Sequence, residues 1–165
     1  MRELGSCYFD KKNYDDALTA YKHSLLLSNG EQSKYIPLAK ERIAEVLIAE
    51  GQDSVNEGDI SDGCNYIQQA ISFALTASSL NELGNCYEMN QQYDEAIKAY
   101  LNSLQLAESN SGNISPLPAY LNLAHAYLLA KRPKDTIDFI NNNVLKKFPD
   151  NSDLIQMLQE AKSEL

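Results

Sequence analysis

The sequence has few of the residues on which catalytic or metal centres are usually built. It contains only two histidines, His23 and His125, and three cysteines, Cys7, Cys64 and Cys86. The cysteines are odd in number and widely spaced, which indicates neither a disulfide framework nor a CxxC metal site. It also lacks an HExxH motif, a glycine-rich phosphate loop and a nucleophile elbow. We therefore expect a protein that is not an enzyme and that holds no metal and no cofactor.

Basic residues and long apolar runs are also scarce. Fourteen Lys and Arg stand against 23 Asp and Glu, which gives a formal net charge of −9. This balance argues against nucleic acid or an anionic membrane as a partner, since both are bound through clustered Lys and Arg. No apolar run approaches the roughly 20 residues that span a bilayer, and the start, "MRELGSCYFD", has no apolar stretch before a cleavage site. We expect a soluble intracellular protein, in the cytoplasm or the nucleus, without membrane insertion.

What the sequence does contain is a repeated phrase. "LGSCYF" begins at Leu4 and "LGNCYE" begins at Leu83, and the agreement continues beyond these six letters. The first copy continues with Tyr14-Asp15, Ala17 and Tyr21, and the second continues at the same spacing with Tyr93-Asp94, Ala96 and Tyr100. Large residues at helical spacing, a polar break and a second amphipathic run predict two helices joined by a turn.

Two further copies complete a regular series. One begins at Leu123-Ala124 and the other at Ile43-Ala44, so the first helices begin their signatures at 4, 43, 83 and 123, in steps of 39, 40 and 40. Such a period predicts a stacked array of similar units. The copy at Ile43 carries surplus residues from Gly51 to Gly58. They form either a longer first helix or a bulging loop, and the longer helix is favoured because "DSVNE" lacks strong helix breakers.

The segment "LGNCYEMNQQYDEAIKAYLNSLQL" resembles a tetratricopeptide repeat (TPR), a helix–turn–helix unit with small residues where its two helices touch. The resemblance implies close approach at Gly5, Ala44, Gly84 and Ala124 on the first helices, opposite Ala17, Gly63, Ala96 and Thr136 on the second. It implies an all-α fold, a right-handed α-solenoid of about four repeats with a period near 40. The family period is about 34, and the extra residues lie between units at "SNGEQSKYIP" and "SNSGNISPLP".

The expected domain organisation is one TPR-like array over residues 1–165, either complete or a section of a longer solenoid. The repeats are expected at about 1–30, 35–76, 77–110 and 116–149. A capping helix at about 150–165 is indicated by an apolar stripe of Leu154, Leu158, Ala161 and Leu165.

In this family the first helices line a concave groove that binds extended peptides or a partner's helix. The residues expected to face the groove lie away from the Gly/Ala–Tyr face. They are Glu41, Glu45, Ile48, Asn81, Asn85, Glu88, Met89, Leu121, Asn122 and His125. The acids would attract Lys or Arg and repel a carboxylate. The amides offer both donors and an acceptor to a peptide backbone.

One subtype of the family grips the C-terminal carboxylate of chaperones through Lys, Asn and Arg on successive first helices. At the matching positions this sequence has Arg2, Ser6, Arg42, Ser78 and Glu82. The Lys–Asn pairing and the last pair of cations are absent, which argues against such a clamp.

The sequence therefore favours an interaction module, an adaptor or scaffold that binds a protein or peptide segment of basic and apolar character. An internal structural section of a larger multi-subunit assembly, or a regulatory TPR domain of a longer protein, is the alternative.

Overall fold

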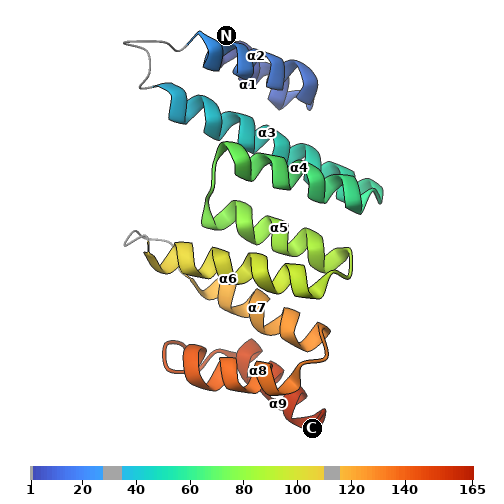
Figure 1. Cartoon of the computed structure of the whole chain (residues 1–165), viewed down its shortest axis with the longest axis vertical. Helices are drawn as coiled ribbons and strands as arrows, with labels where there is room; N and C mark the ends of the chain where they lie inside the picture. Colours follow the sequence, from blue (N-terminus) through green and yellow to red (C-terminus); the bar gives the residue numbers. More distant parts are fainter. Residues whose placement is uncertain (1, 28–34, 110–115) are drawn as a thin grey trace. The chain divides into compact units, whose positions relative to one another are not determined.

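A computed structural model describes residues 2–27, 35–109 and 116–165, and every regular element in these ranges is helical. Figure 1 shows the helices following one another along the chain. They are α1 (Arg2–Asp10), α2 (Tyr14–Leu26), α3 (Ile36–Glu57), α4 (Ile60–Phe73), α5 (Ala77–Met89), α6 (Tyr93–Ser109), α7 (Leu117–Leu129), α8 (Pro133–Phe139), the π-helix η2 (Ile140–Val144) and α9 (Ser152–Ser163). The predicted all-α class is confirmed.

The chain forms two compact units, Met1–Glu82 and Leu83–Leu165, and the boundary falls within α5. In the first unit α2 packs on α1 and α3, and α3 packs on α4. In the second unit α7 packs on α6, α8 and α9. Helices that are neighbours in sequence thus pack together, as a helix–turn–helix array requires. The repeat boundaries given above remain a prediction, and most of the two inter-repeat segments lies outside the described residues.

The surplus residues of the second repeat belong to a long helix, as predicted. Helix α3 runs for 22 residues from Ile36, with a proline in its first turn, to Glu57. It ends at Gly58, whose φ of 100° is accessible to glycine at little cost. The alternative of a bulging loop is excluded.

The close-approach position of that repeat is Gly51, however, and not Ala44. A Cβ atom added at Gly51 would lie 2.8 Å from the carbonyl oxygen of Gly63 and 2.8 Å from the side chain of Ile67. One added at Gly63 would lie 2.6 Å from the carbonyl oxygen of Gly51. The sequence comparison placed Gly63 opposite Ala44 because it assumed equal steps, whereas the added turns of α3 move the contact seven residues along the chain.

The turns between paired helices support this register. Each turn has one residue in the left-handed region, seven positions after the small residue of the first helix. The pairs are Gly5 and Lys12, Gly51 and Gly58, Gly84 and Gln91, and Ala124 and Lys131. The three turn residues that are not glycine have φ between 55° and 59°. The same turn geometry therefore recurs in all four helix pairs.

The repeated Gly–Tyr pattern reflects packing within one repeat. A Cβ atom on Gly5 would meet the ring of Tyr21 at 2.8 Å, and one on Gly84 would meet the ring of Tyr100 at 2.4 Å. Both rings are buried. Each ring covers the glycine of its own repeat, and both tyrosines also belong to core clusters that include residues of the following repeat. The other tyrosines of the pattern, Tyr8, Tyr14, Tyr87 and Tyr93, are half-buried.

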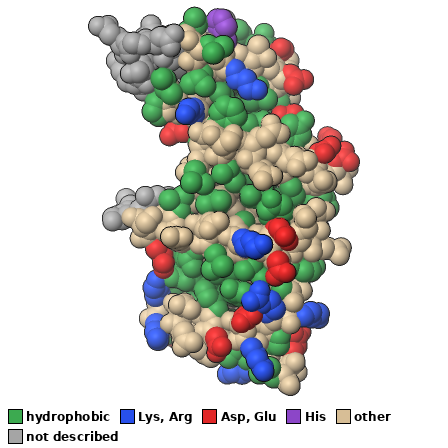
Figure 2. Space-filling view, in the orientation of Figure 1, with side chains coloured by type: hydrophobic (Ala, Val, Ile, Leu, Met, Phe, Trp, Pro, Cys, Tyr) green, Lys and Arg blue, Asp and Glu red, His purple; other side chains and the backbone are tan. Residues whose placement is uncertain are grey.

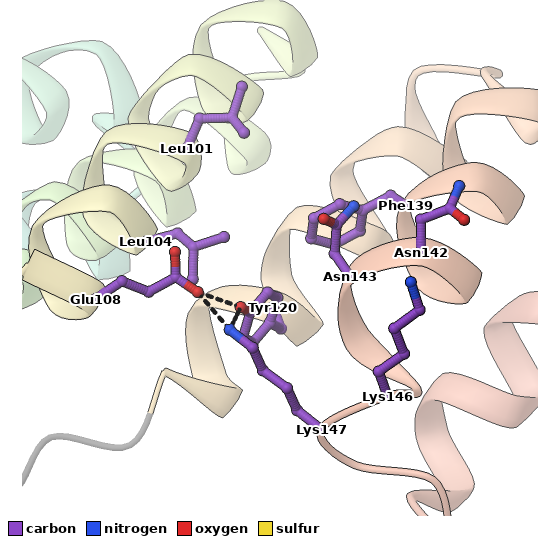
Figure 3. A pocket seen from close by; sticks show the side chains of 9 residues that line it. All are labelled: Leu101, Leu104, Glu108, Tyr120, Phe139, Asn142, Asn143, Lys146 and Lys147. Carbon is purple, nitrogen blue, oxygen red and sulfur yellow. Dashed lines mark hydrogen bonds and ion pairs between the residues drawn. The ribbon is translucent and has the colours of Figure 1, made fainter.

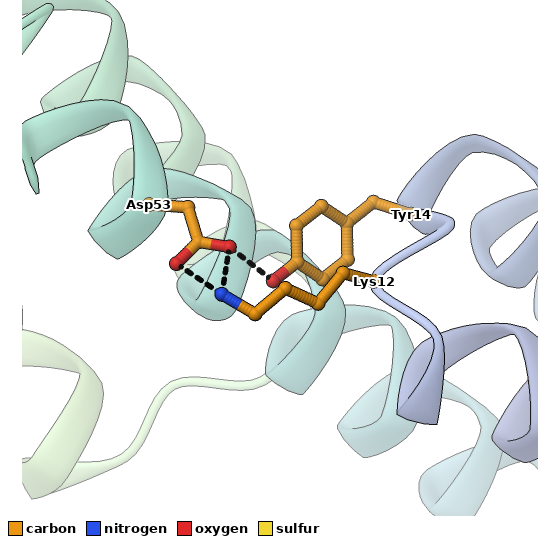
Figure 4. Close-up of polar contacts among 3 residues, drawn as sticks. All are labelled: Lys12, Tyr14 and Asp53. Carbon is orange, nitrogen blue, oxygen red and sulfur yellow. Dashed lines mark hydrogen bonds and ion pairs between the residues drawn. The ribbon is translucent and has the colours of Figure 1, made fainter. Parts of the chain in front are cut away.

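A polar contact joins the first turn to α3 (Figure 4). Lys12 Nζ donates to both carboxylate oxygens of Asp53, at 2.9 and 2.8 Å, and the Tyr14 hydroxyl donates to Asp53 Oδ2 at 2.6 Å. Burial, reinforced by the hydrogen bond to Asp53, raises the pKa of Tyr14 to about 12. The contact explains how the second half of α3 is held beside the first repeat.

The end of the chain covers the last repeat. Leu154, Leu158 and Ala161 of α9 are buried, and the first two join the core of the second unit. Leu165 is 71% exposed and lies outside the buried stripe, and the capping role of this segment remains a prediction. Among the described residues, no helix is both long and apolar enough to cross a bilayer.

Candidate functional site

Three of the predicted groove residues of the first unit lie on α3. Glu41 and Glu45 are exposed, whereas Ile48 is half-buried and packs against the core. Arg42 Nη1 donates to Glu45 Oε2 at 2.5 Å, and this hydrogen bond raises the pKa of the arginine. Both side chains of the pair are about half exposed, so the pair contributes little to stability. Glu41 is thus the more available of the two acids.

In the second unit two pairs of predicted residues meet across α5 and α7. Asn85 Oδ1 accepts a hydrogen bond from Asn122 Nδ2 at 3.3 Å, and Glu88 Oε1 lies 3.1 Å from His125 Nδ1. Each pair is separated by 37 residues, and the members on each helix are three residues apart. The two helices therefore present their polar side chains in register, as two successive rungs.

The Asn rung is tied to the packing of the repeat. Tyr100, whose ring covers Gly84, donates its hydroxyl hydrogen bond to Asn85 Oδ1 at 2.8 Å. In the first unit, the equivalent Tyr21 hydroxyl lies 2.9 Å from the Ser6 hydroxyl. The tyrosine at the equivalent position thus contacts a serine hydroxyl in one repeat and an asparagine amide in the other.

Glu88 is the chemically distinctive member of the set. Its Oε1 faces His125, but its Oε2 is buried and has no hydrogen-bond partner among the described residues. A buried acceptor without a partner costs about 1–3 kcal/mol, and more when it is charged. The neighbouring Met89 is 55% exposed. The Glu88 side chain as a whole is 20% exposed, so a cation can approach its carboxylate from solvent, beside the apolar surface of Met89.

Two other predicted residues contribute less directly. Asn81 is half-buried on α5, and Leu121 is half-buried against the core of the second unit. The structure thus brings together Asn85, Glu88, Asn122 and His125, with Met89 beside them. Whether Glu41, Glu45, Ile48 and Asn81 belong to the same surface remains a prediction.

Three of the positions that match the chaperone clamp are engaged in other contacts, whereas Ser78 is exposed. The side chain of Arg2 lies outside the described residues. The Ser6 hydroxyl meets Tyr21, Arg42 pairs with Glu45, and Glu82 accepts a hydrogen bond from Gln52.

A second feature of this unit was missed by the sequence analysis. A cavity of about 450 Å³ lies between α6, the first turn of α7 and the α8–η2 segment (Figure 3). At its edge Lys147 Nζ donates to Glu108 Oε1 at 2.6 Å and to the Tyr120 hydroxyl at 2.6 Å, and Tyr120 donates to Glu108. The one available signal was the separation of Glu108 and Lys147 by 39 residues, close to the repeat step.

The described residues contain no cluster of three or more His, Cys, Asp or Glu side chains arranged to hold a metal. His23 lies exposed on α2, and the acidic pairs Asp15-Asp16 and Asp94-Glu95 lie in the first turns of α2 and α6. The dipole of each helix favours negative charge in its first turn.

Comparison with known protein families gives two matches, both described as tetratricopeptide repeat. One family model matches residues 75–140 and the other residues 3–30, and together they cover more than half of the chain. Among curated proteins, the chain is similar to a tetratricopeptide repeat protein 30 homolog from Drosophila pseudoobscura pseudoobscura. The two are 24% identical over 87% of this chain and 24% of that protein. This chain spans about a quarter of the length of the curated relatives it matches.

Two solved structures illustrate the likeness in fold. The N-terminal domain of stress-induced protein-1 from C. elegans has a TM-score of 0.66 at 12% identity, over 75% of this chain and 98% of that one. The second TPR domain of human RPAP3, in complex with the HSP70 peptide SGPTIEEVD, has a TM-score of 0.60 at 18% identity, over 76% and 98%. At these identities the likeness concerns the fold.

Proposed function

Because this chain belongs to the tetratricopeptide repeat family, we propose that it is a non-catalytic interaction module that binds a segment of another protein. The segment carries a basic side chain next to an apolar one and binds across α5 and α7. A structural neighbour of the same fold, the RPAP3 domain, is in complex with a peptide, which supports this class of function. The proposal places the module in the cytoplasm or the nucleus, without a nucleic-acid partner.

The observation that carries the proposal is the unpartnered Glu88 Oε2 beside His125. The Glu88 side chain is 20% exposed, so a Lys or Arg of the partner would approach the exposed part of this carboxylate and pair with its charge. His125 fixes the other oxygen, so the carboxylate is already oriented. Glu88 therefore supplies the charge selectivity of the site, and it repels the terminal carboxylate that a chaperone tail would bring.

The neighbouring residues define the rest of the segment. Met89 offers a flexible exposed thioether against which an apolar side chain can pack. The Asn85 and Asn122 amides, linked to each other, can bond to the peptide backbone.

The alternative function is a structural section of a larger assembly component, or a regulatory domain of a longer protein. The specific observation in its favour is that this chain aligns with only 24% of its curated relative. In that case the segment that contacts Glu88 would come from the same polypeptide or from a neighbouring subunit.

A peptide array tests the proposal. The probes are short peptides in which Lys or Arg is placed at varied distances from Leu or Met, with acidic and neutral versions of each. We compare the parent with Glu88→Gln, which keeps the shape of the side chain, and with Glu95→Gln, an exposed acid on α6 of the same unit. Loss of a buried charge pair costs about 2–5 kcal/mol, so Glu88→Gln should weaken binding of the basic peptides at least tenfold.

The Glu95→Gln control should bind as the parent does. Equal binding of the basic peptides by the parent and by Glu88→Gln would overturn the proposal. Tighter binding of the acidic peptides than of the basic ones by the parent would also overturn it.

A further inference from the structure

The cavity of the second unit has an apolar floor and one polar wall (Figure 3). Leu104 and Tyr120 are buried beneath it, and Phe139 is half-buried. Leu101, which also lines it, is 42% exposed although it is a large apolar side chain. The polar lining consists of Asn142, Asn143, Lys146 and Lys147, together with Glu108, which pairs with Lys147. A volume of about 450 Å³ is within the range of sites that hold small ligands or a few side chains.

The two lysines of the wall have different roles. Lys147 is held by Glu108 and Tyr120, and the hydrogen bond to Glu108 raises its pKa to about 12. Lys146, in contrast, makes no ion pair with any residue in the described ranges. Figure 3 shows its ammonium on the same wall as the side chains of Asn142 and Asn143. The cavity therefore keeps one positive charge that no acid of the described chain neutralises.

The amides of the wall are presented by an unusual piece of backbone. Residues Ile140–Val144 form a π-helix, in which Leu145 N donates to Ile140 O at 2.9 Å. The wider turn leaves Ile140 and Val144 fully buried, while the three asparagines between them are all exposed. Single π-turns are rare and occur frequently at functional sites. This is an observation independent of the cavity, and it concerns the same residues.

The charge distribution also changes here. Residues 116–165 contain six basic and six acidic side chains, so they carry no net charge in a chain of net charge −9. On the face drawn in Figure 2, basic and acidic side chains lie interspersed over α8 and α9. This part of the second unit therefore lacks the acidic excess found elsewhere in the chain, and it repels an acidic ligand less than that acidic part does.

We propose that this cavity is a second binding site, for an extended segment of a partner protein in which an apolar side chain stands close to an acidic one. The apolar side chain packs on Leu101, Leu104 and Phe139, which covers the exposed leucine. The carboxylate pairs with Lys146, and the amides of Asn142 and Asn143 bond to the backbone between them. The apolar floor favours a peptide over a small inorganic anion, because an anion gains no favourable contact from three apolar side chains.

This site differs from the one across α5 and α7 in both place and preference. The first selects basic segments through Glu88, and the second selects acidic segments through Lys146. The two proposals can therefore fail independently.

The test is selection from a phage-displayed library of short random peptides, using the full chain as bait. Selected peptides are synthesised with both ends blocked, so that no terminal carboxylate contributes, and their affinities are measured by fluorescence anisotropy. We expect a class of peptides with Leu, Ile, Met or Phe within two positions of Asp or Glu. Lys146→Glu should weaken this class at least tenfold, about 1.4 kcal/mol or more, and Leu101→Asp should do the same.

Lys134→Glu is the matched control, since Lys134 is exposed on α8 but does not line the cavity. It changes the net charge equally and should leave the affinity within twofold of the parent. The proposal is overturned if no acidic–apolar class is selected, if Lys146→Glu binds that class as tightly as the parent does, or if Lys134→Glu weakens it equally. If acidic peptides instead lose affinity only with Glu88→Gln, both proposals are wrong.

Discussion

Replacing Gly84 with alanine sets two known effects against each other at one position. Gly84 lies inside α5, where alanine is favoured over glycine by about 1 kcal/mol. An added Cβ, however, would lie 2.4, 2.5 and 2.8 Å from three atoms of the Tyr100 ring. Real Cβ atoms do not approach this closely, so either the ring or α5 must move.

The ring has little freedom to move. Tyr100 is 1% exposed, and its hydroxyl is held by Asn85. Overpacking of this kind costs about 1–3 kcal/mol, and the gain in helix propensity offsets part of that cost. We expect Gly84→Ala to lower the free energy of unfolding by about 1–2 kcal/mol. For a chain of this size, that corresponds to a fall in Tm of about 2–8 °C.

Thermal and urea unfolding, followed by circular dichroism, measure this change. A double-mutant cycle identifies its cause, because the cost of Gly84→Ala should disappear in a Tyr100→Leu background, where the ring is absent. If Gly84→Ala matches or exceeds the parent in stability, or costs as much without the Tyr100 ring, the packing described for α5 and α6 is incorrect.

Two other substitutions test the backbone and the buried charge. Gln91 has φ of 59°, a region that disfavours side chains, so Gln91→Gly should stabilise the chain by about 0.5–1 kcal/mol; a lower midpoint in urea would contradict this expectation. Burial, which outweighs the hydrogen bond from Tyr66, raises the pKa of Glu50, and its Oε2 has no hydrogen-bond partner among the described residues. A raised carboxyl pKa means that the folded chain binds the proton more tightly than the unfolded chain, so this glutamate costs stability at neutral pH and less as pH falls through its folded pKa. Glu50→Gln should therefore raise the free energy of unfolding at pH 7 by about 1 kcal/mol, with a higher Tm as the readout. This gain in stability should shrink as the pH is lowered. A gain that is constant with pH would show that the charge of Glu50 is not its cause.

The helix–turn–helix pattern could be predicted from the sequence because it depends on local spacing. Apolar residues at helical intervals, acids at the starts of second helices and the missing breakers in "DSVNE" each have a local physical cause, and the corresponding helices are present. The long α3 followed from the same reasoning. Its register did not, because Ala44 and Gly51 are both small and an equal step favoured the first. The decisive feature is the left-handed Gly58 seven residues after Gly51, which repeats the geometry of the other turns.

The candidate sites could be predicted only in part. Position on the first helices was sufficient to select Asn85, Glu88, Asn122 and His125, because one face of a helix follows from its period. That Glu88 Oε2 is left without a partner depends on side chains brought together from α5 and α7. The cavity beside η2 depends on a π-turn. The spacing of apolar residues in an α-helical pattern gives no sign of such a turn, so the cavity could not be predicted from the sequence.

The Gly–Tyr contact also explains how one repeat pattern can present different binding chemistry. In both units a buried tyrosine covers the glycine of the first helix and directs its hydroxyl to the residue that follows that glycine, Ser6 in one and Asn85 in the other. A serine presents a single hydroxyl, with one donor hydrogen, and in Ser6 this hydroxyl contacts the tyrosine. An asparagine uses its oxygen for Tyr100 and Asn122, and its two amide hydrogens have no hydrogen-bond acceptor among the described residues. Packing therefore fixes where the group lies, and the identity of that one residue decides whether the position only supports the fold or can also bind a partner.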